Sequence, residues 1–224
     1  SSDLPRLPHC TPVWVTERDF CLKKIFLNGF ILLYVLNEPK LIIERGISES
    51  VLKTGMQRDF NILFMPVFFM SLIILMVRPL ITQLAFLYVD HKNKEFDQIV
   101  RKLLLYIAIG GLFVVGLAYL LGVPVLGLVF GVDLTAYQLS FTILIFAGVL
   151  YALAIVFENI LTIMRKQHLL ISVYVIMLLV TLFITKKFIY SYGMLGAAMA
   201  FLIVMIAYLL GISIIYYRER MKEK

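Results

Sequence analysis

One arginine, Arg78, interrupts an otherwise uncharged apolar run that extends from Phe60 to Val89. A charged side chain at the centre of a membrane-spanning helix costs about 2.5–3.5 kcal/mol on insertion scales. Charged residues at such positions commonly face a cavity or bind a substrate or an ion, so we place Arg78 in a candidate binding cavity. The alternative is an arginine near a helix end whose side chain extends to the membrane interface.

A second charge inside an apolar segment is Glu158, which lies in the segment 137–164. Small or polar residues share its helical spacing, and they are Tyr151, Ala154 and Thr162. This spacing places them on one face of a helix, whereas large apolar side chains cover the other faces. We therefore expect the segment to present a polar stripe to a cavity or to another helix.

The depth of the two charges allows them to act together. Both are expected toward the cytoplasmic half of the membrane, roughly 10–15 Å from the ends of their helices. An ion pair between Arg78 and Glu158 would lower the cost of burying each charge. Thr82 follows Arg78 at a spacing of four residues and shares its helical face. The candidate substrate-binding residues are Arg78, Glu158, Lys40, Tyr151 and Thr82.

The sequence holds no pattern of residues that would support catalysis or hold a metal. The three histidines fall in loops or at the ends of apolar segments, and Cys10 and Cys21 lack the spacing of metal ligands. Paired carboxylates, a glycine-rich phosphate loop and a nucleophile elbow are also missing from the sequence. We therefore expect a protein that is not an enzyme and that uses no cofactor and no metal.

The composition indicates that lipid is the solvent of this chain. Hydrophobic residues make up 62% of the 224 positions and charged residues 16%, whereas a soluble domain has about 25% charged residues. The net charge is +7. Because the basic residues lie in short segments between apolar runs, they follow the positive-inside pattern and do not indicate a nucleic-acid partner.

Six apolar segments are expected to cross the membrane, and together they predict an all-α, polytopic helix bundle. They are 22–36, 60–89, 103–123, 137–164, 169–185 and 193–217. The first is short for a span, and Asn37–Lys40 end its apolar run. We expect it to be extended, tilted or broken, with an amphipathic continuation over 41–52. The second contains Pro66 and Pro79 and would measure about 45 Å as one helix, so we expect it to kink. Residues 124–136 are expected to form a loop without basic residues.

The distribution of lysine and arginine sets the expected orientation. Fourteen basic residues fall on one side of the predicted spans and six on the other. This bias places both ends of the chain in the cytoplasm. We expect three parts: a cytoplasmic or divergent segment 1–21, a membrane lobe 22–217 and a basic cytoplasmic tail 218–224. Since the chain begins Ser-Ser-Asp without a signal peptide, an upstream part is expected as well.

Small residues predict where helices approach one another closely. The segment GMLGAAMA at 193–200 would place Gly193, Gly196 and two alanines on one face, and Gly110, Gly111 and Gly116 would do the same in the third span. Helix–helix contact is the simpler reading of these residues. A hinge for conformational change is the alternative.

Four segments carry a resemblance to a known family. They are LLYVLNEPKLIIE at 32–44, FNILFMPVFFMSLIILMVRPLITQLA at 60–85, GVPVLGLVFG at 122–131 and YSYGMLGAAMA at 190–200. In this order and spacing they resemble the C-terminal half of bacterial polysaccharide flippases, within the multidrug/oligosaccharidyl-lipid/polysaccharide exporter superfamily. Leu41 and Glu44 depart from the tyrosine and aspartate that are common at these positions of the first motif.

The resemblance implies one six-helix lobe of a two-lobe transporter that works by alternating access. The expected substrate is an undecaprenyl-diphosphate-linked oligosaccharide, such as an O-antigen or capsular repeat unit, in the inner membrane of a bacterium. Arg78 would suit this substrate, because arginine can bind a phosphate through two hydrogen bonds. The implied partners are membrane lipid, an N-terminal lobe, a polysaccharide polymerase and other assembly proteins. Glu158 would be a candidate for coupling to an ion gradient.

Other functions stay open at this stage. A multidrug exporter or an exporter of lipid-linked peptidoglycan precursor would share the fold, and drug exporters favour acidic cation sites. A membrane-embedded polymerase would need large extracytoplasmic loops, which the sequence does not provide. A non-transporting subunit of a glycan assembly complex would fit if neither Arg78 nor Glu158 faces water.

Overall fold

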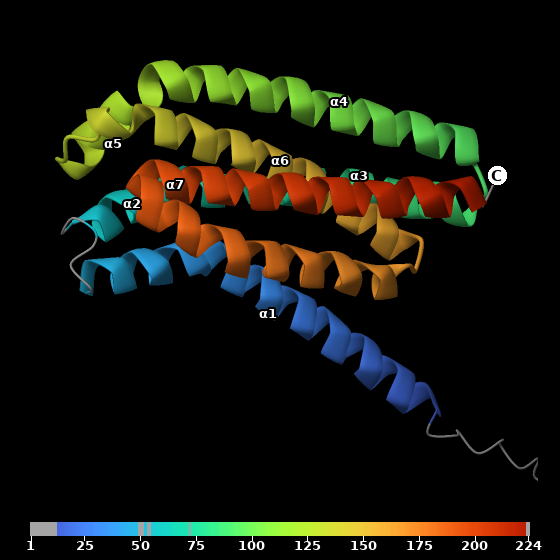
Figure 1. The fold of residues 1–224 in the computed structure, drawn as a ribbon. Coiled ribbons are helices and arrows are strands. Elements are labelled where there is room, and N and C mark those ends of the chain that lie inside the picture. Colours follow the sequence, from blue (N-terminus) through green and yellow to red (C-terminus); the bar gives the residue numbers. More distant parts are fainter. Residues whose placement is uncertain (1–12, 49–51, 53–54, 72, 223–224) are drawn as a thin grey trace, which may run out of the picture.

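The apolar runs of the sequence fold into helices. The computed structural model describes residues 13–48, 52, 55–71 and 73–222, without the side chains of residues 13–29, 68–71, 73–78 and 167. The helices are α1 (Val13–Ser48), α2 (Met56–Ser71), α3 (Ile73–Val89), α4 (Asn93–Leu117), α5 (Val123–Phe130), α6 (Gln138–Ile163) and α7 (Leu170–Lys222), with a π-helical turn η1 (Ala118–Gly122) and 3₁₀ turns η2 (Thr135–Tyr137) and η3 (Gln167–Leu169) (Figure 1). Since the described residues form no strand, the expected all-α fold is confirmed.

Three helical stretches of the described chain are long and apolar enough to cross a membrane. They are 93–130, 135–163 and 170–222. A chain with such helices is a membrane protein by length and composition. The count of six spans and the membrane in which they lie stay predictions.

Helix α1 continues through the segment where the first span was expected to end. Pro39 lies inside the helix, so the polar residues 37–40 do not end it and the helix is extended, one of the forms that the sequence allowed. A proline removes one backbone hydrogen bond and bends a helix, and α1 bends along its length in Figure 1. Packing of α1 against α7 holds the helix together across this bend. Of the expected segment 1–21, residues 13–21 belong to α1, and residues 1–12 lie outside the described part.

The second predicted span contains α2 and α3, and residue 72 between them lies outside the described part. Helix α2 ends at Ser71 and α3 begins at Ile73, with Pro66 inside the first and Pro79 inside the second. The expected kink of this segment stays a prediction, because the residue between α2 and α3 lies outside the described residues.

The expected loop 124–136 is largely helical, which corrects the sequence prediction. Helix α5 starts after Gly122 with Pro124 in its first turn, a position where proline needs no hydrogen-bond donor. It ends at Gly131, whose left-handed backbone suits glycine. Asp133 then accepts hydrogen bonds from the hydroxyl and the backbone N–H of Thr135, at 2.6 and 3.0 Å, and these bonds lower the pKa of Asp133 from its usual value.

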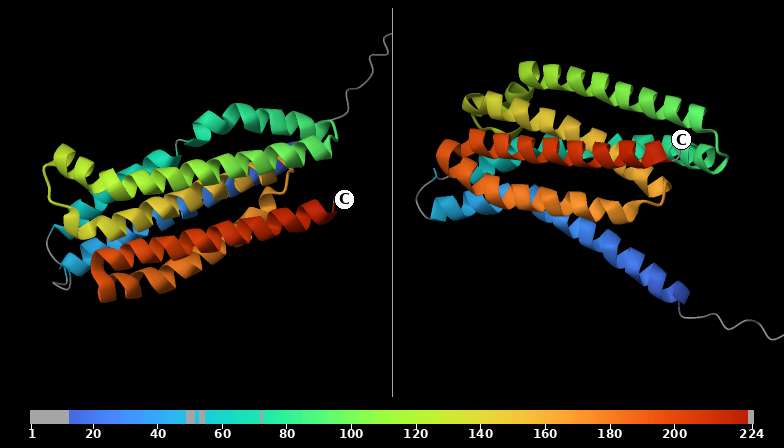
Figure 2. Two further views of the ribbon diagram at one scale, coloured as in Figure 1. Left: turned by 90° about the horizontal axis from the view of Figure 1, so that it is seen from above. Right: turned by 45° about the vertical axis from the view of Figure 1, so that its right-hand side comes forward.

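Helix α7 contains the fifth and sixth predicted spans. At Gly193 the backbone adopts φ 58° and ψ −126°, a conformation that a residue with a side chain rarely adopts. The two halves of α7 on either side of Gly193 run in opposite directions and lie side by side (Figures 1 and 2). A Cβ on Gly196 would lie 1.9 Å from the carbonyl oxygen of Phe188, so this turn requires both glycines.

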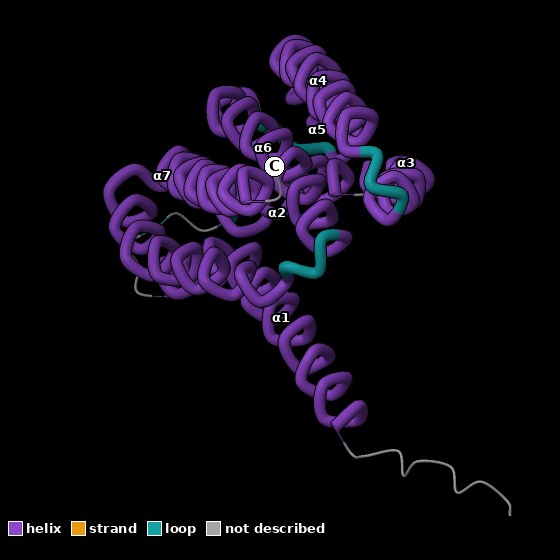
Figure 3. Tube along the Cα trace, turned by 90° about the vertical axis from the view of Figure 1, so that its right-hand side faces the viewer, coloured by secondary structure: helices purple, strands orange, loops and turns teal. Residues whose placement is uncertain are grey.

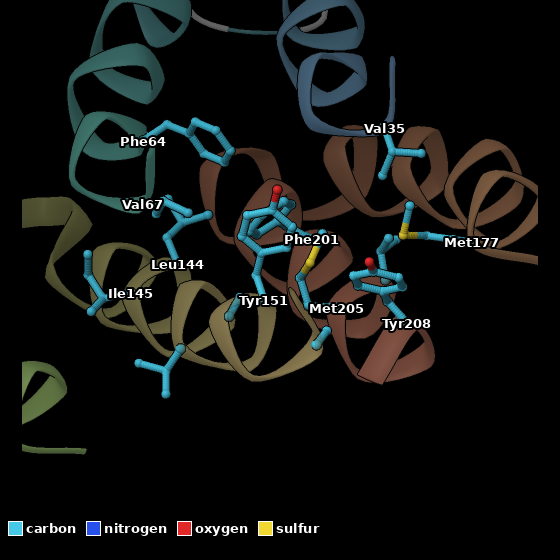
Figure 4. Packing of buried hydrophobic residues seen from close by; sticks show 14 of the residues in the cluster. Val35, Phe64, Val67, Leu144, Ile145, Tyr151, Met177, Phe201, Met205 and Tyr208 are labelled. Atoms are coloured by element: carbon cyan, nitrogen blue, oxygen red, sulfur yellow. The ribbon is translucent and has the colours of Figure 1, made fainter. Parts of the chain in front are cut away.

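Helix α6 lies at the centre of the bundle and contacts α2, α3, α4 and α7. Its alanines Ala147 and Ala154 are fully buried, and the small side chains let neighbouring helices approach. Figure 4 shows the layer in which Leu144 and Tyr151 of α6 meet Phe201 of α7 and Phe64 of α2. The predicted fourth span, 137–164, agrees with the observed helix.

The glycines of the third predicted span do not form one close-packed face. A Cβ on Gly111 would lie 2.3 Å from Val149 Cγ1, so this glycine does allow α4 to approach α6. Gly110 and Gly116 have open space around the corresponding positions. The prediction of a shared face is therefore wrong for these two, because α4 lies at the outer edge of the bundle (Figure 3).

The two ends of the bundle differ in charge. The start of α1, the turn between α3 and α4, the turn between α6 and α7 and the end of α7 share one end (Figure 1). The described basic residues of this end, from the start of α4 onward, are Lys92, Lys94, Arg101, Lys102, Arg165, Lys166, Arg218, Arg220 and Lys222. Those toward the opposite end are Lys40, Arg45, Arg58, Lys186 and Lys187. We call the first the basic end.

Candidate functional site

A polar group inside the bundle joins α6 to both halves of α7. The Tyr208 hydroxyl in the second half of α7 donates a hydrogen bond of 2.8 Å to Glu158 Oε2 of α6. The hydroxyl of Tyr174, in the first half of α7, lies 3.3 Å from the Tyr208 hydroxyl. Either hydroxyl can be the donor in this second contact, and Tyr174 is also hydrogen-bonded to Glu158.

The two tyrosines of this group belong to the hydrophobic core. Tyr174 and Tyr208 are buried, and Glu158 is partly buried. The tyrosine rings also contact each other, with centroids 5.7 Å apart. In Figure 4 Tyr208 lies beside Met205 and Met177 of α7. A carboxylate in such surroundings depends on hydrogen bonds, because each unmet polar interaction is costly away from water.

Tyr151 lies on the face of α6 that the sequence predicted. It is seven residues before Glu158, and its side chain is buried in the core. In Figure 4 the Tyr151 side chain lies beside Phe201 and Met205 of α7, and Tyr208 lies further along α7. The stripe that carries Tyr151 and Glu158 therefore faces α7, as one of the two readings of the sequence expected.

The arrangement can hold a proton or a small cation. A carboxylate accepts from the Tyr208 hydroxyl and keeps further lone pairs for a proton or a cation. The Tyr174 and Tyr208 hydroxyls form a short chain along which hydrogen bonds can reorient. Among the described residues, no group of three or more histidine, cysteine, aspartate or glutamate side chains is placed to hold a metal ion.

The structure leaves the predicted pair of Arg78 and Glu158 untested. The backbone of Arg78 lies in α3, and its side chain is outside the described part. Thr82 lies one turn further along α3, is exposed and takes part in an interaction of its own. The described partners of Glu158 come from α7, so an approach of Arg78 to this carboxylate stays a prediction.

Lys40 lies apart from the Glu158 group. Its ammonium nitrogen lies 5.4 Å from the centre of the Phe64 ring, so the described contact of Lys40 joins α1 to α2. A cation over an aromatic face is attracted by the electrons of the ring. The five predicted residues thus fall into three places: Glu158 with Tyr151 on α6, Lys40 on α1, and Arg78 with Thr82 on α3.

Glu38 of α1 is a second buried carboxylate that sequence reasoning did not select. Its residue surface is 4% exposed, and its side chain is hydrogen-bonded to Thr185 of α7. Its other oxygen, Oε2, has no hydrogen-bond partner in the described part of the chain. The sequence predicted the end of a span at this point. Because α1 continues through Pro39, Glu38 instead faces the interior of the bundle.

Tyr174 and Tyr208 were also missed. The tyrosines near the ends of predicted spans were assigned to aromatic belts. Tyr174 and Tyr208 instead lie inside the fifth and sixth predicted spans. A buried tyrosine usually needs a partner for its hydroxyl, and that requirement was the available signal.

A separate polar cluster fixes the basic end. Arg220 of α7 donates from Nε to Asp97 Oδ1 at 2.9 Å and from Nη1 to Asn93 Oδ1 at 3.1 Å. Its guanidinium carbon also lies 4.9 Å from the centre of the Phe96 ring. These contacts join the end of α7 to the start of α4. They are a structural junction and lie apart from the Glu158 group.

No protein-family model, curated protein or solved structure matches this chain.

Proposed function

We propose that this chain is one lobe of a membrane transporter, and that the complete transporter flips undecaprenyl-diphosphate-linked oligosaccharide units across the bacterial inner membrane for surface polysaccharide assembly. Its six spans would be α1, α2 with α3, α4, α6 and the two halves of α7. The basic end would lie in the cytoplasm, by the positive-inside rule. An N-terminal lobe would form the other wall of the cavity.

The observation that carries the proposal is the hydrogen bond between Tyr208 and Glu158 inside apolar helices. An ionisable residue at such a place is by default a candidate for a substrate or ion pathway. Because the group joins α6 to both halves of α7, a change in its protonation would alter how these three segments pack. Such a change could drive alternating access.

The proposed roles differ between the two charged residues. Glu158 would take up and release the coupling ion, with Tyr208 and Tyr174 orienting its carboxylate. Arg78 would bind the diphosphate of the substrate through paired hydrogen bonds. No cofactor or catalytic step is needed for this cycle, which moves a lipid-linked sugar without changing its bonds.

One observation favours a second candidate function. Two charged side chains that are buried or partly buried, Glu38 of α1 and Glu158 of α6, are acidic. Acidic cavities suit cationic drugs, so a multidrug exporter of the same architecture is the alternative.

The test is surface glycan delivery in cells that make the whole protein. We expect Arg78→Ala and Glu158→Gln each to abolish delivery while the protein stays abundant in the membrane. Lys94→Ala, which removes an exposed charge near the start of α4, is the matched control and should deliver normally. Normal delivery by both variants would overturn the proposal. Normal delivery with increased sensitivity to cationic drugs would support the second candidate.

The orientation has its own test. In a chain whose two cysteines are replaced by serine, Lys92→Cys should react with a membrane-impermeant thiol reagent from the cytoplasm only. Asp133→Cys, in the short loop between α5 and η2, should react from outside only. The opposite labelling pattern would reverse the proposed topology.

A further inference from the structure

A cavity lies at the basic end between the start of α4 and the end of α7. Its volume is about 230 Å³. Arg101 and the ion pair of Arg220 with Asp97 form its polar side. Its apolar side is formed by Val100, Leu104 and Met221. One small space thus combines a charged rim with an apolar wall.

The charge of this cavity is positive and is carried by Arg101. The Asp97 carboxylate already accepts from Arg220 Nε at 2.9 Å, so the two charges compensate each other. Arg101 is exposed and forms no ion pair with a described residue. Tyr217, which also lines the cavity, exposes 58% of its surface and offers a hydroxyl as a second donor. An anion would find two free donors here.

An exposed apolar stripe continues from the cavity toward the middle of the bundle. Along α7, Met221 and Tyr217 share a helical face with exposed apolar residues one or more turns earlier. These are Ile214, Leu210 and Ile206. From Met221 to Ile206 the helix rises by about 22 Å, which exceeds half of a hydrocarbon core of about 30 Å. The stripe is long enough to lie along a whole acyl chain.

We propose that this cavity and stripe bind an anionic phospholipid, with the phosphate on Arg101 and an acyl chain along α7. The site suits such a lipid in charge and in depth. Arg101 would lie at the level of the head groups, and the apolar stripe on α7 would lie at the level of the acyl chains. Basic pockets between membrane helices on the cytoplasmic side bind such lipids in general. The ligand is a component of the membrane, and the site is distinct from the proposed transport pathway.

Native mass spectrometry of the full chain, released from detergent with equal amounts of phosphatidylglycerol and phosphatidylcholine, tests the proposal. We expect the chain to retain phosphatidylglycerol preferentially. Arg101→Gln should reduce this preference about fivefold, a ratio that corresponds to about 1 kcal/mol per basic residue near the surface. Arg101→Lys should restore part of it. Lys94→Gln removes one exposed charge from the same helix outside the cavity and should leave the preference unchanged.

Three results would overturn the proposal. The first is equal retention of both lipids by the unmodified chain. The second is an equal loss for Lys94→Gln and Arg101→Gln, since this would reflect net charge alone. The third is displacement of the lipid by inorganic phosphate, because a site that also holds the acyl chain should favour the lipid over the free anion.

Discussion

The hydroxyl of Tyr208 donates a hydrogen bond of 2.8 Å to the carboxylate of Glu158, and this bond joins two helices at residues 50 positions apart in sequence. The donor is buried, so water cannot replace it when it is removed. The bond therefore contributes both to the packing of α6 on α7 and to the state of the carboxylate.

Tyr208→Phe should lower the free energy of unfolding by about 1.5–3 kcal/mol, the usual range for a hydrogen bond to a charged group. Thermal unfolding in one detergent measures the change. Tyr192→Phe is the control, because it removes a tyrosine hydroxyl from an exposed position of the same helix, apart from Glu158. Equal losses for the two variants would mean that the direct bond to Glu158 has no special weight.

Gly193→Ala should destabilise the turn between the halves of α7. A residue with a Cβ is strained at φ 58° and ψ −126°, at a cost on the order of 1–3 kcal/mol. Gly116→Ala is the matched control, since Gly116 lies in α4 with open space around the added Cβ. There alanine should be neutral or stabilise the helix by up to about 1 kcal/mol. The melting temperatures of the two variants should therefore move apart, and a loss confined to Gly116→Ala would contradict the turn geometry.

The sequence predicted the parts of this structure that depend on local pattern. Apolar runs predicted helices. The fourth span agrees with α6 because the helix ends where the apolar run ends. The prolines at 66 and 79 lie inside α2 and α3, so neither marks the boundary between these helices. Pro39 does not end α1, because a proline in a helix that packs against another helix can be accommodated by a bend.

Long-range contacts were beyond a single sequence. The helical spacing of Tyr151 and Glu158 correctly placed them on one face, but no local signal identified which helix would meet that face. The turn at Gly193 brings Tyr174 and Tyr208 together, because it lays the two halves of α7 side by side. Glu38 lies inside the bundle because α1 continues through Pro39. The glycines 110 and 116 show the reverse error, since a small residue permits close approach without requiring it.

Arg220→Lys should loosen the junction between α4 and α7 although it keeps the positive charge. Lysine cannot reproduce the planar set of donors that reaches Asp97 and Asn93 together, nor stack on Phe96 in the same way. We expect a loss of about 1–3 kcal/mol, because the arginine side chain is only 6% exposed. A double-mutant cycle with Asp97→Asn should show a coupling energy above about 0.5 kcal/mol. Strict additivity of the two changes would exclude a direct interaction.

Glu38→Met should make the chain more stable. The Glu38 carboxylate is buried, and its Oε2 has no partner in the described part of the chain, so the folded state bears the cost of its desolvation. Methionine has a similar length and no such cost, and we expect the free energy of unfolding to rise by about 1 kcal/mol after the lost contact with Thr185 is subtracted.

Glu44→Met is the control for Glu38→Met, since it removes an exposed glutamate from the same helix and should change stability little. Thermal unfolding and surface glycan delivery are measured on the same variants. A buried polar group that lowers stability is retained when it serves function, so Glu38→Met should combine higher stability with weaker delivery. Lower stability for Glu38→Met would mean that a partner satisfies the carboxylate in the folded protein.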